Sequence, residues 1–401
     1  MLPVWQNGGR EEKCGGLIYP GAVSVMASPR LGFNEAVALT VIFLSVKVMI
    51  SHLALMFPLG LSATWMIPLM HLPVGLIGFA VLAWLLNQFP GRTIIEIGEE
   101  LVGPALNIFF ALVIYVFFTG GSALVLRQSA EFMLTDFFPD TPISVVAATY
   151  MVGAALIVYL GLETLGRVAR IAFPFLIIGL ALLILLTANL WQPHGIYPLW
   201  GPGILELSWV ALSTLGVGVE IFFLALAAPY LPQGRLLPIG LISVLAAGLV
   251  VAAVILASLL VFPYPVVQEW TLPVFAITRA IEWGGFFVRM ETLFLPLWVF
   301  SALLAHATAL YLSVATAARA LKLPYHRPFI LPTVVLILAA AFVPPNFPAA
   351  MDWGFAFLVR WSFIFLGVIV AVLVAAALLR KRQQGKGGKT GRRPGRRTNH
   401  T

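Results

Sequence analysis

The chain has 401 residues, of which 61% are hydrophobic and 10% are charged, and its formal net charge at pH 7 is +8. Soluble globular domains average roughly 45–50% apolar and about 25% charged residues. This composition excludes an ordinary water-soluble domain, because a core of this size cannot hide so much apolar surface from water. The sequence therefore predicts an all-α polytopic membrane protein.

Apolar runs long enough to cross a bilayer recur along the whole chain. A spanning helix needs about 20 mostly apolar residues to cross a hydrocarbon core about 30 Å thick. The chain contains ten such runs, and each run ends at charged residues, prolines or glycines. They lie at 33–57, 66–88, 105–133, 142–161, 169–191, 207–230, 236–262, 291–318, 328–346 and 354–379. We expect a disordered tail at 1–32, a ten-helix transmembrane domain at 33–379 and a basic disordered cytoplasmic tail at 380–401.

The distribution of Lys and Arg predicts that both ends of the chain are cytoplasmic. If the first span starts inside, 19 of the 24 basic residues fall in cytoplasmic segments, and the short outer loops contain none. The long segment 263–290 breaks the pattern with Arg279 and Arg289, and the positive-inside rule is weakest for long loops. The mixture of apolar and charged residues there favours a short amphipathic helix on the outer surface.

The partners and cofactors that the composition allows are few. The tail from Arg380 onward carries nine basic residues and no acid, which is typical of a solvated segment beside anionic membrane lipids. No aromatic residue interleaves these charges, so a nucleic-acid partner is not expected. Cys14 is the sole cysteine, so a metal cluster is not expected. Standard catalytic motifs are absent, and we expect neither an enzyme nor a cofactor.

An odd number of predicted spans in each half indicates that the two halves have opposite orientations in the membrane. Five spans carry the chain from inside to outside, so the second five run with the opposite topology. Residues 33–191 and 207–379 would then form a five-plus-five inverted repeat, whose sites lie at the midplane between the first helices of each half. The halves share no convincing sequence similarity, so this prediction depends on topology alone.

Two charged residues lie deep in the first helices of these halves. Lys47 lies near the middle of 33–57, and Glu220 lies at the middle of 207–230. A charge at the bilayer centre costs about 2.5–3.5 kcal/mol on insertion scales, so such residues usually face a cavity or pair with each other. Our hypothesis is that Lys47 and Glu220 share one buried polar site, directly or through a water. The alternative is a structural pair that locks the two helices.

Small and polar residues accompany these charges. Gly216 and Gly218 precede Glu220, and glycine lowers the cost of unwinding a helix. A break in 207–230 is therefore predicted, with close helix packing at small residues as the alternative. His306, near the centre of 291–318 with Ser301 about one turn before it, suits either packing or a ligand contact. The stretch beginning at Thr119, Thr-Gly-Gly-Ser, suits a cavity wall or tight packing equally well.

Three stretches together resemble one known family, the endospore germination permeases, which are the integral-membrane B subunits of spore germinant receptors. The resemblance covers about 33–379. The stretches are Gly161-Leu-Glu-Thr-Leu-Gly-Arg167 with Phe173-Pro174; Leu272-Pro-Val-Phe-Ala-Ile-Thr-Arg279-Ala-Ile281, followed by Phe287-Val-Arg-Met-Glu291 and Trp298; and Phe89-Pro-Gly91 with Ile94-Ile-Glu96 through Leu101-Val-Gly103.

This resemblance implies a fold, a function and partners. The family belongs to the amino acid–polyamine–organocation superfamily, which has the LeuT-like five-plus-five fold. It implies a subunit in the spore inner membrane that binds an amino acid or a similar germinant and works with A and C subunits. The superfamily's site corresponds here to the region of Lys47, Thr119, Gly216, Gly218, Glu220 and Ser301 to His306.

One departure from the superfamily pattern leaves a second function open. Superfamily transporters usually have glycines in the unwound part of the first span, where this chain has Val46-Lys47-Val48. A lysine there would replace a coupling cation or occupy the site and prevent transport. The rival to a receptor subunit is a proton- or cation-coupled amino-acid transporter, in which Lys47 and Glu220 take part in coupling. A conduit for ions or water is a third possibility.

Overall fold

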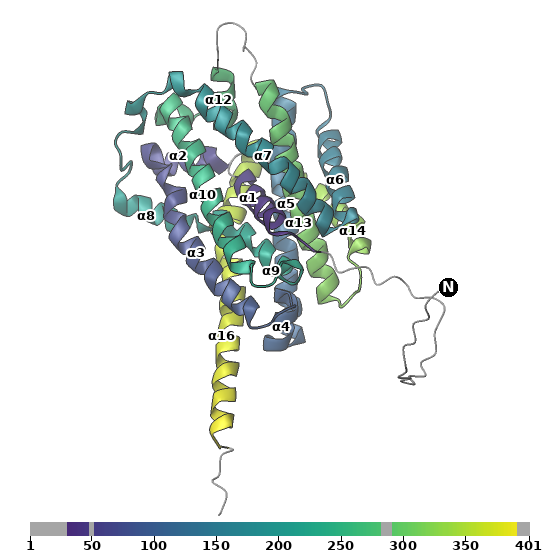
Figure 1. Ribbon diagram of the computed structural model, residues 1–401. Coiled ribbons are helices and arrows are strands. Elements are labelled where there is room, and N and C mark those ends of the chain that lie inside the picture. Colours follow the sequence, from purple (N-terminus) through teal and green to yellow (C-terminus); the bar gives the residue numbers. More distant parts are fainter. Residues whose placement is uncertain (1–29, 48–51, 282–290, 391–401) are drawn as a thin grey trace, which may run out of the picture.

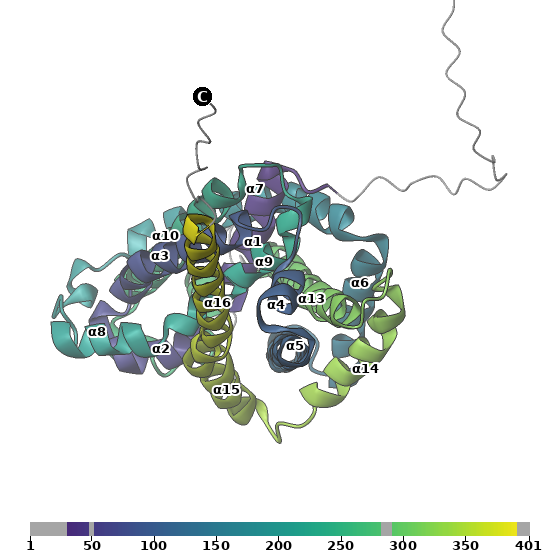
Figure 2. The same cartoon turned by 90° about the horizontal axis from the view of Figure 1, so that it is seen from below.

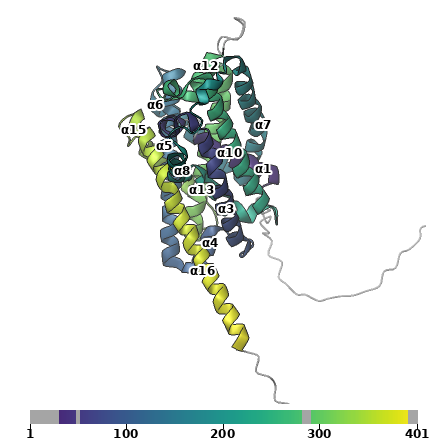
Figure 3. The ribbon, with the colours of Figure 1, turned by 90° about the vertical axis from the view of Figure 1, so that its left-hand side faces the viewer.

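The computed structural model describes residues 30–47, 52–281 and 291–390. Every regular element in these ranges is a helix. The helices stand side by side as one bundle, with α4 (Ile94–Val102) at one end and α12 (Pro273–Ala280) at the other (Figure 1). The last helix, α16 (Ser362–Thr390), runs past the rest of the bundle at the end that holds α4 (Figure 3).

Each predicted span has a helical counterpart. In the first half these are α1 (Phe33–Lys47), α2 (Leu53–Gly60), α3 (Met66–Asn87), α5 (Pro104–Asp136), α6 (Ile143–Leu160) and α7 (Leu162–Leu186). In the second half they are α8 (Ile204–Ser213), the 3₁₀ segment η5 (Leu215–Phe222), α9 (Phe223–Ala227), the 3₁₀ turn η6 (Ala228–Tyr230), α10 (Leu236–Val261), α13 (Glu291–Ala320), α14 (Ile330–Ala341), α15 (Phe347–Phe355), the π-helical turn η8 (Ala356–Trp361) and α16.

The predicted count of ten spans is not confirmed. Among the described residues, seven helices are long and apolar enough to cross a membrane, and a bent pair makes up to eight. The predicted span 33–57 corresponds to two shorter helices, α1 and α2, and 328–346 to the 12-residue α14. At 1.5 Å per residue, α14 is about 18 Å long, which is shorter than the hydrocarbon core. Length and composition therefore identify an integral membrane protein without fixing its number of crossings.

The end of the bundle that contains α4 is stabilised by ion pairs. We call it the basic end, after the Lys and Arg residues of α13, α16 and the segment after α13 that pair there. Thr93 and Glu96 form a capping box that starts α4. Glu96 also accepts a hydrogen bond of 2.6 Å from Arg319 at the end of α13. Glu99 and Glu100 pair with Lys322, which follows α13, and with Arg380 of α16. The short helix α4 thereby ties together the ends of two long helices that are distant in sequence.

Contacts between aromatic rings stabilise the opposite end of the bundle, at α12. The ring of Phe275 in α12 lies edge-on to Phe132 of α5, with centroids 5.2 Å apart, and Arg279 pairs with Asp136 at 3.2 Å. Where the sequence predicted one short amphipathic helix within 263–290, the described residues form two short helices, α11 (Tyr264–Val267) and α12; their place on the outer surface of the membrane stays a prediction. Arg289 lies outside the described residues.

The C-terminal helix is longer than the sequence predicted. α16 remains helical to Thr390, beyond the expected start of the tail at 380.

Candidate functional site

The helix predicted at 207–230 is broken near its middle, as its glycines suggested. α8 ends at Ser213, the 3₁₀ segment η5 follows, and the two parts of the pair differ in direction by 43°. The hydroxyl of Thr214 donates to the carbonyl of Val210 at 2.8 Å. Nε2 of His71, on α3, lies 2.9 Å from the carbonyl oxygen of Ala211. These contacts satisfy carbonyls that a helix end leaves without intrahelical partners.

A small cavity, which we call the polar cavity, lies on one side of η5. Its volume is about 40 Å³, which is room for a few water-sized groups, since one water needs roughly 10–15 Å³. The polar groups in its lining are Ser122 of α5, Glu220 of η5 and His306 of α13. The rest of the lining is apolar: Phe43, Val46, Phe117, Phe118, Gly121, Val125, Ala305, Ala309 and Leu358.

His306 links this cavity to a second buried polar group. Its Nδ1 lies 3.3 Å from the hydroxyl of Ser122, and its ring is edge-on to Tyr150 of α6, with centroids 5.7 Å apart. Neither Nε2 of His306 nor the hydroxyl of Tyr150 has a hydrogen-bond partner within the described part of the chain. A buried polar group left without a partner costs about 1–3 kcal/mol. Such atoms mark a place where an occupant able to form hydrogen bonds would be stabilised.

Phe43, Phe117 and Phe118 line the polar cavity with aromatic rings. The ring of Phe118 lies 6.4 Å from Phe43 of α1 and 6.4 Å from Phe222 of η5, measured between centroids. Glu220 is only 5% exposed. A carboxylate in such a low-dielectric setting interacts strongly with a cation or a hydrogen-bond donor, and ring faces also attract cations. The cavity is thus suited to a small molecule that carries such a group.

The structure brings together some of the predicted site residues. Glu220 and His306 line the same polar cavity. Lys47 is the last residue of α1, directly after the cavity residue Val46, but its side chain lies outside the described residues. The pairing of Lys47 with Glu220 therefore stays a hypothesis. Thr119 lies one turn before Ser122 and donates to the hydroxyl of Ser313 on α13 at 3.1 Å, which links α5 to α13 beside the cavity.

The two glycines before Glu220 differ in their surroundings. A Cβ on Gly216 would collide with the hydroxyl of Ser362 and with the carbonyl oxygen of Val359, so this glycine permits close packing of η5 on η8 and α16. A Cβ on Gly218 would meet no atom within 4 Å. Gly218 instead lines a different, apolar cavity on the opposite side of η5.

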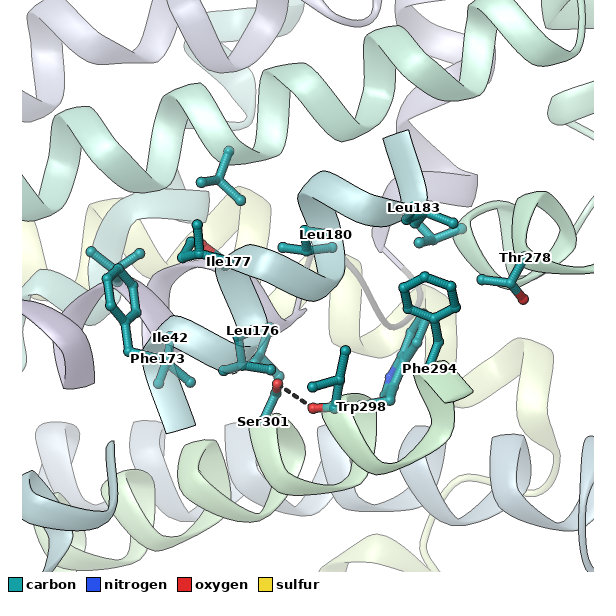
Figure 4. Close-up of a pocket in the computed structure, with 16 residues that line it drawn as sticks. Ile42, Phe173, Leu176, Ile177, Leu180, Leu183, Thr278, Phe294, Trp298 and Ser301 are labelled. Atoms are coloured by element: carbon teal, nitrogen blue, oxygen red, sulfur yellow. Dashed lines mark hydrogen bonds between the residues drawn. The ribbon is translucent and has the colours of Figure 1, made fainter. Parts of the chain in front are cut away.

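Ser301 lies apart from Glu220 and His306. It lines a separate cavity of about 70 Å³ between α1, α7, α12 and α13. Figure 4 shows this cavity, where Leu176, Leu180 and Trp298 supply apolar walls. The hydroxyl of Ser301 donates to the carbonyl of Leu297 at 2.6 Å, the bond dashed in Figure 4. Phe118, which lines the polar cavity, and Tyr150, which packs against His306, carried no signal in the sequence, because aromatic residues are common in apolar spans.

A family model described as "Spore germination protein" matches residues 35–347. The chain belongs to this spore germination protein family. A family relative, "Spore germination protein KB" of Bacillus subtilis (strain 168), is 23% identical over 333 residues, which cover 80% of this chain and 89% of that protein. "Spore germination protein YndE" of the same organism is 24% identical over 243 residues, which cover 59% of this chain and 65% of that protein.

Two solved structures are similar to this family member. Mhp1, a nucleobase-cation-symport-1 family transporter in a closed conformation with bromovinylhydantoin bound, aligns with a TM-score of 0.64 and 15% identity, covering 89% of this chain and 80% of its own. MhsT in complex with L-phenylalanine aligns with a TM-score of 0.62 and 15% identity, covering 86% and 89%. At this identity the likeness establishes the fold alone. The predicted LeuT-like fold is confirmed, and family and fold are those of permeases.

Proposed function

We propose that this spore germination protein is the membrane subunit of a germinant receptor, which binds a small germinant such as an amino acid and signals to A and C subunits. One observation carries the proposal. Glu220, on a broken helix, shares the polar cavity with His306, next to the end of α1 that carries Lys47. An ammonium group would interact with the Glu220 carboxylate, and a second polar group of the germinant would reach His306.

A path leads from this cavity to the basic end of the bundle. η5 continues through α9 into η6, which ends at Tyr230. The hydroxyl of Tyr230 accepts a hydrogen bond from Arg319, and its carbonyl accepts one of 2.9 Å from the backbone N–H of Leu31. A germinant that binds one arrangement of η5 more tightly shifts the population toward that arrangement. The contacts of Tyr230 would change with it and alter the surface offered to partner subunits.

The proposal includes an orientation in the spore inner membrane. The basic end, with α4 and the ends of α13 and α16, faces the cytoplasm, and both termini lie on that side. The excess of Lys and Arg in the segments at this end supports the orientation, because cytoplasmic loops are enriched in these residues.

The test is ligand-dependent thermal stability of the purified full-length protein across a panel of amino acids and nucleosides. At least one amino acid should stabilise the wild type. Glu220→Gln should weaken its apparent affinity by roughly 10- to 100-fold, because hydrogen bonds to charged groups contribute about 1.5–3 kcal/mol. The matched control is Glu206→Gln, an exposed position of α8, which should bind as the wild type does. Wild-type affinity in Glu220→Gln would refute the proposed site.

A proton- or cation-coupled amino-acid transporter is the second candidate, and the fold shared with the transporter Mhp1 favours it. In that case Glu220 and Lys47 would take part in coupling. Uptake of a labelled amino acid by the purified protein alone in liposomes separates the two functions. A receptor subunit should bind its germinant without accumulating it, whereas a coupled transporter should accumulate it when a proton or cation gradient is imposed.

A further inference from the structure

A large apolar cavity, which we call the lateral groove, lies on the side of η5 away from the polar cavity. Its volume is about 550 Å³, and its walls come mainly from α3, α10, α16 and η5. Figure 2 shows α3, α10 and α16 next to one another at the side of the bundle. Rim residues Val81, Phe363 and Leu378 are 40%, 45% and 46% exposed. The groove therefore opens to the outer surface of the spanning helices, which is the surface that meets lipid.

The lateral groove is built to stay open and apolar. A Cβ on Gly78 of α3, on Gly218 of η5 or on Gly367 of α16 would meet no atom within 4 Å. A glycine inside a helix lowers the stability of the protein by about 0.5–1 kcal/mol relative to alanine. At these three positions no neighbouring side chain packs into the space next to the glycine. Of the described residues that line the groove, His71 alone is polar, and its Nε2 lies 2.9 Å from the carbonyl oxygen of Ala211. The occupant of the groove is accordingly a molecule with a long apolar part.

The charges beside the groove indicate the other part of this occupant. On α16, Gly367, Val374 and Leu378 line the groove, and residues three and four positions apart share a helix face. One turn after Leu378 the same face presents Lys381 and Arg382, both exposed. Arg235 directly precedes α10 at the same end. An apolar groove that ends in cations at the membrane surface matches a lipid with an anionic head group.

We propose that the lateral groove binds one anionic phospholipid, with an acyl chain against Gly78, Gly218 and Gly367 and its phosphate beside Lys381 and Arg382. The lipid contacts the side of η5 that faces away from the polar cavity. Gly218, Val219 and Ile221 of this segment face the groove, while Glu220 between them lines the polar cavity. A bound acyl chain thus limits the movement of the segment that carries Glu220. The lipid site goes beyond the proposed function and does not depend on which ligand the polar cavity takes.

Native mass spectrometry of the delipidated full-length protein tests the site. Dioleoylphosphatidylglycerol and dioleoylphosphatidylcholine are added separately at equal concentration. The wild type should retain one phosphatidylglycerol in preference to phosphatidylcholine. Gly367→Leu and Gly78→Leu, which fill the groove from α16 and from α3, should each lose this lipid. Val368→Leu, at an exposed position of α16 outside the groove, is the matched control and should retain it.

The head-group contacts are tested separately, so the result does not depend on the groove variants folding. Each basic side chain near a lipid surface contributes about 1 kcal/mol, so Lys381→Gln with Arg382→Gln should weaken phosphatidylglycerol binding by about thirtyfold. Phosphatidylcholine binding should not change. Arg170→Gln, which removes an exposed cation from the first half of α7, should have no effect. Equal retention of the two lipids by the wild type, or unchanged phosphatidylglycerol retention in the filled or neutralised variants, would overturn the proposal.

Discussion

At the scale of single residues, the chemistry of the polar cavity depends on side chains from several helices. Ser122, Glu220 and His306 come from α5, η5 and α13, and Tyr150 of α6 lies behind His306. The membrane interior offers no bulk water to satisfy buried polar atoms. Among the residues that the structure describes, Nε2 of His306 and the hydroxyl of Tyr150 have no hydrogen-bond partner, which lowers the stability of the protein. A germinant or an ordered water that supplies these bonds is stabilised by a similar amount.

Replacing Tyr150 by phenylalanine should stabilise the protein in the absence of ligand. The Tyr150 hydroxyl is buried with no hydrogen-bond partner in the ranges that the structure describes, so its removal should raise the free energy of unfolding by about 1 kcal/mol. Equilibrium unfolding in mixed detergent measures this. Tyr115→Phe is the control, because the Tyr115 hydroxyl lies 3.0 Å from that of Thr333, and its loss should destabilise by about 1 kcal/mol. Destabilisation by both changes would show that Tyr150 has a partner.

The sequence identifies some of these residues and not others for a geometric reason. Glu220 and His306 stand out because polar residues are rare in apolar spans. Ser301 was placed with them in the predicted site, but it lies five residues before His306, which places the two side chains about 140° apart around the helix. They consequently face different cavities. Which face of a span points inward depends on its neighbours, and the hydrophobic pattern of a nearly uniform apolar helix does not record it.

At the scale of elements, η5 is the segment on which the site depends. One side of it lines the polar cavity, the other lines the lateral groove, and Gly216 packs against α16. The carbonyl of Gly216 also accepts a hydrogen bond of 3.3 Å from Ser362. The two glycines suggested a break but not their separate roles, because their surroundings come from η8, α16 and α3, which are distant in sequence.

These surroundings predict opposite effects for two identical changes. Gly216→Ala should destabilise the protein by about 1–3 kcal/mol, because the added methyl group overpacks the contact with Ser362 and Val359. Gly218→Ala has open space around its Cβ and should be neutral or stabilising by up to about 1 kcal/mol, since alanine reduces the entropy of the unfolded chain. Thermal unfolding of both variants checks the difference. Equal destabilisation would mean that η5 packs differently.

The helix α4 was not predicted, although its sequence contains a recognisable signal. Thr93 followed three residues later by Glu96 is the capping-box pattern, and in the structure the backbone N–H of Thr93 donates to the Glu96 carboxylate at 2.8 Å. At nine residues, α4 is too short to span a membrane, so the length of its apolar run did not distinguish it. Its role in joining α13 and α16 depends on Arg319 and Arg380, more than 200 positions later in the chain. Local patterns could not reveal those partners.

The ion pairs of α4 should differ in strength with their exposure. Glu96→Gln keeps a residue suited to the capping box but removes the charge that faces Arg319; the Glu96 and Arg319 side chains are 42% and 19% exposed. We expect a loss of about 1.5 kcal/mol in the free energy of unfolding and faster trypsin cleavage after Arg92. Glu99→Gln breaks the pair with Lys322, which is 69% exposed, and should cost less than about 0.5 kcal/mol. Equal losses would contradict this ranking.

At the scale of the whole molecule, the two ends of the bundle are built from different interactions. Ion pairs join α4, α13 and α16 at the basic end, whereas aromatic rings of α5 and α12 dominate the other. The inverted architecture followed from counting spans, even though the two halves share no convincing similarity. The exact count did not, because hydropathy does not distinguish one broken span from two short helices, and α1, α2 and α14 are all shorter than a full crossing.

This asymmetry predicts the orientation of the protein, and two cysteine substitutions test it. In a Cys14→Ser background, which removes the sole native cysteine, Gln383→Cys lies on α16 beyond Arg380 and Asp140→Cys lies in the loop between α5 and α6 at the opposite end. Both positions are exposed. A membrane-impermeant maleimide should label Asp140→Cys in intact cells and Gln383→Cys only after permeabilisation. The reverse pattern would place the nine basic residues from Arg380 onward outside the cell, against the excess of Lys and Arg in cytoplasmic segments. It would also turn the lipid cations of α16 away from the inner leaflet, whose anionic lipids give them their proposed function.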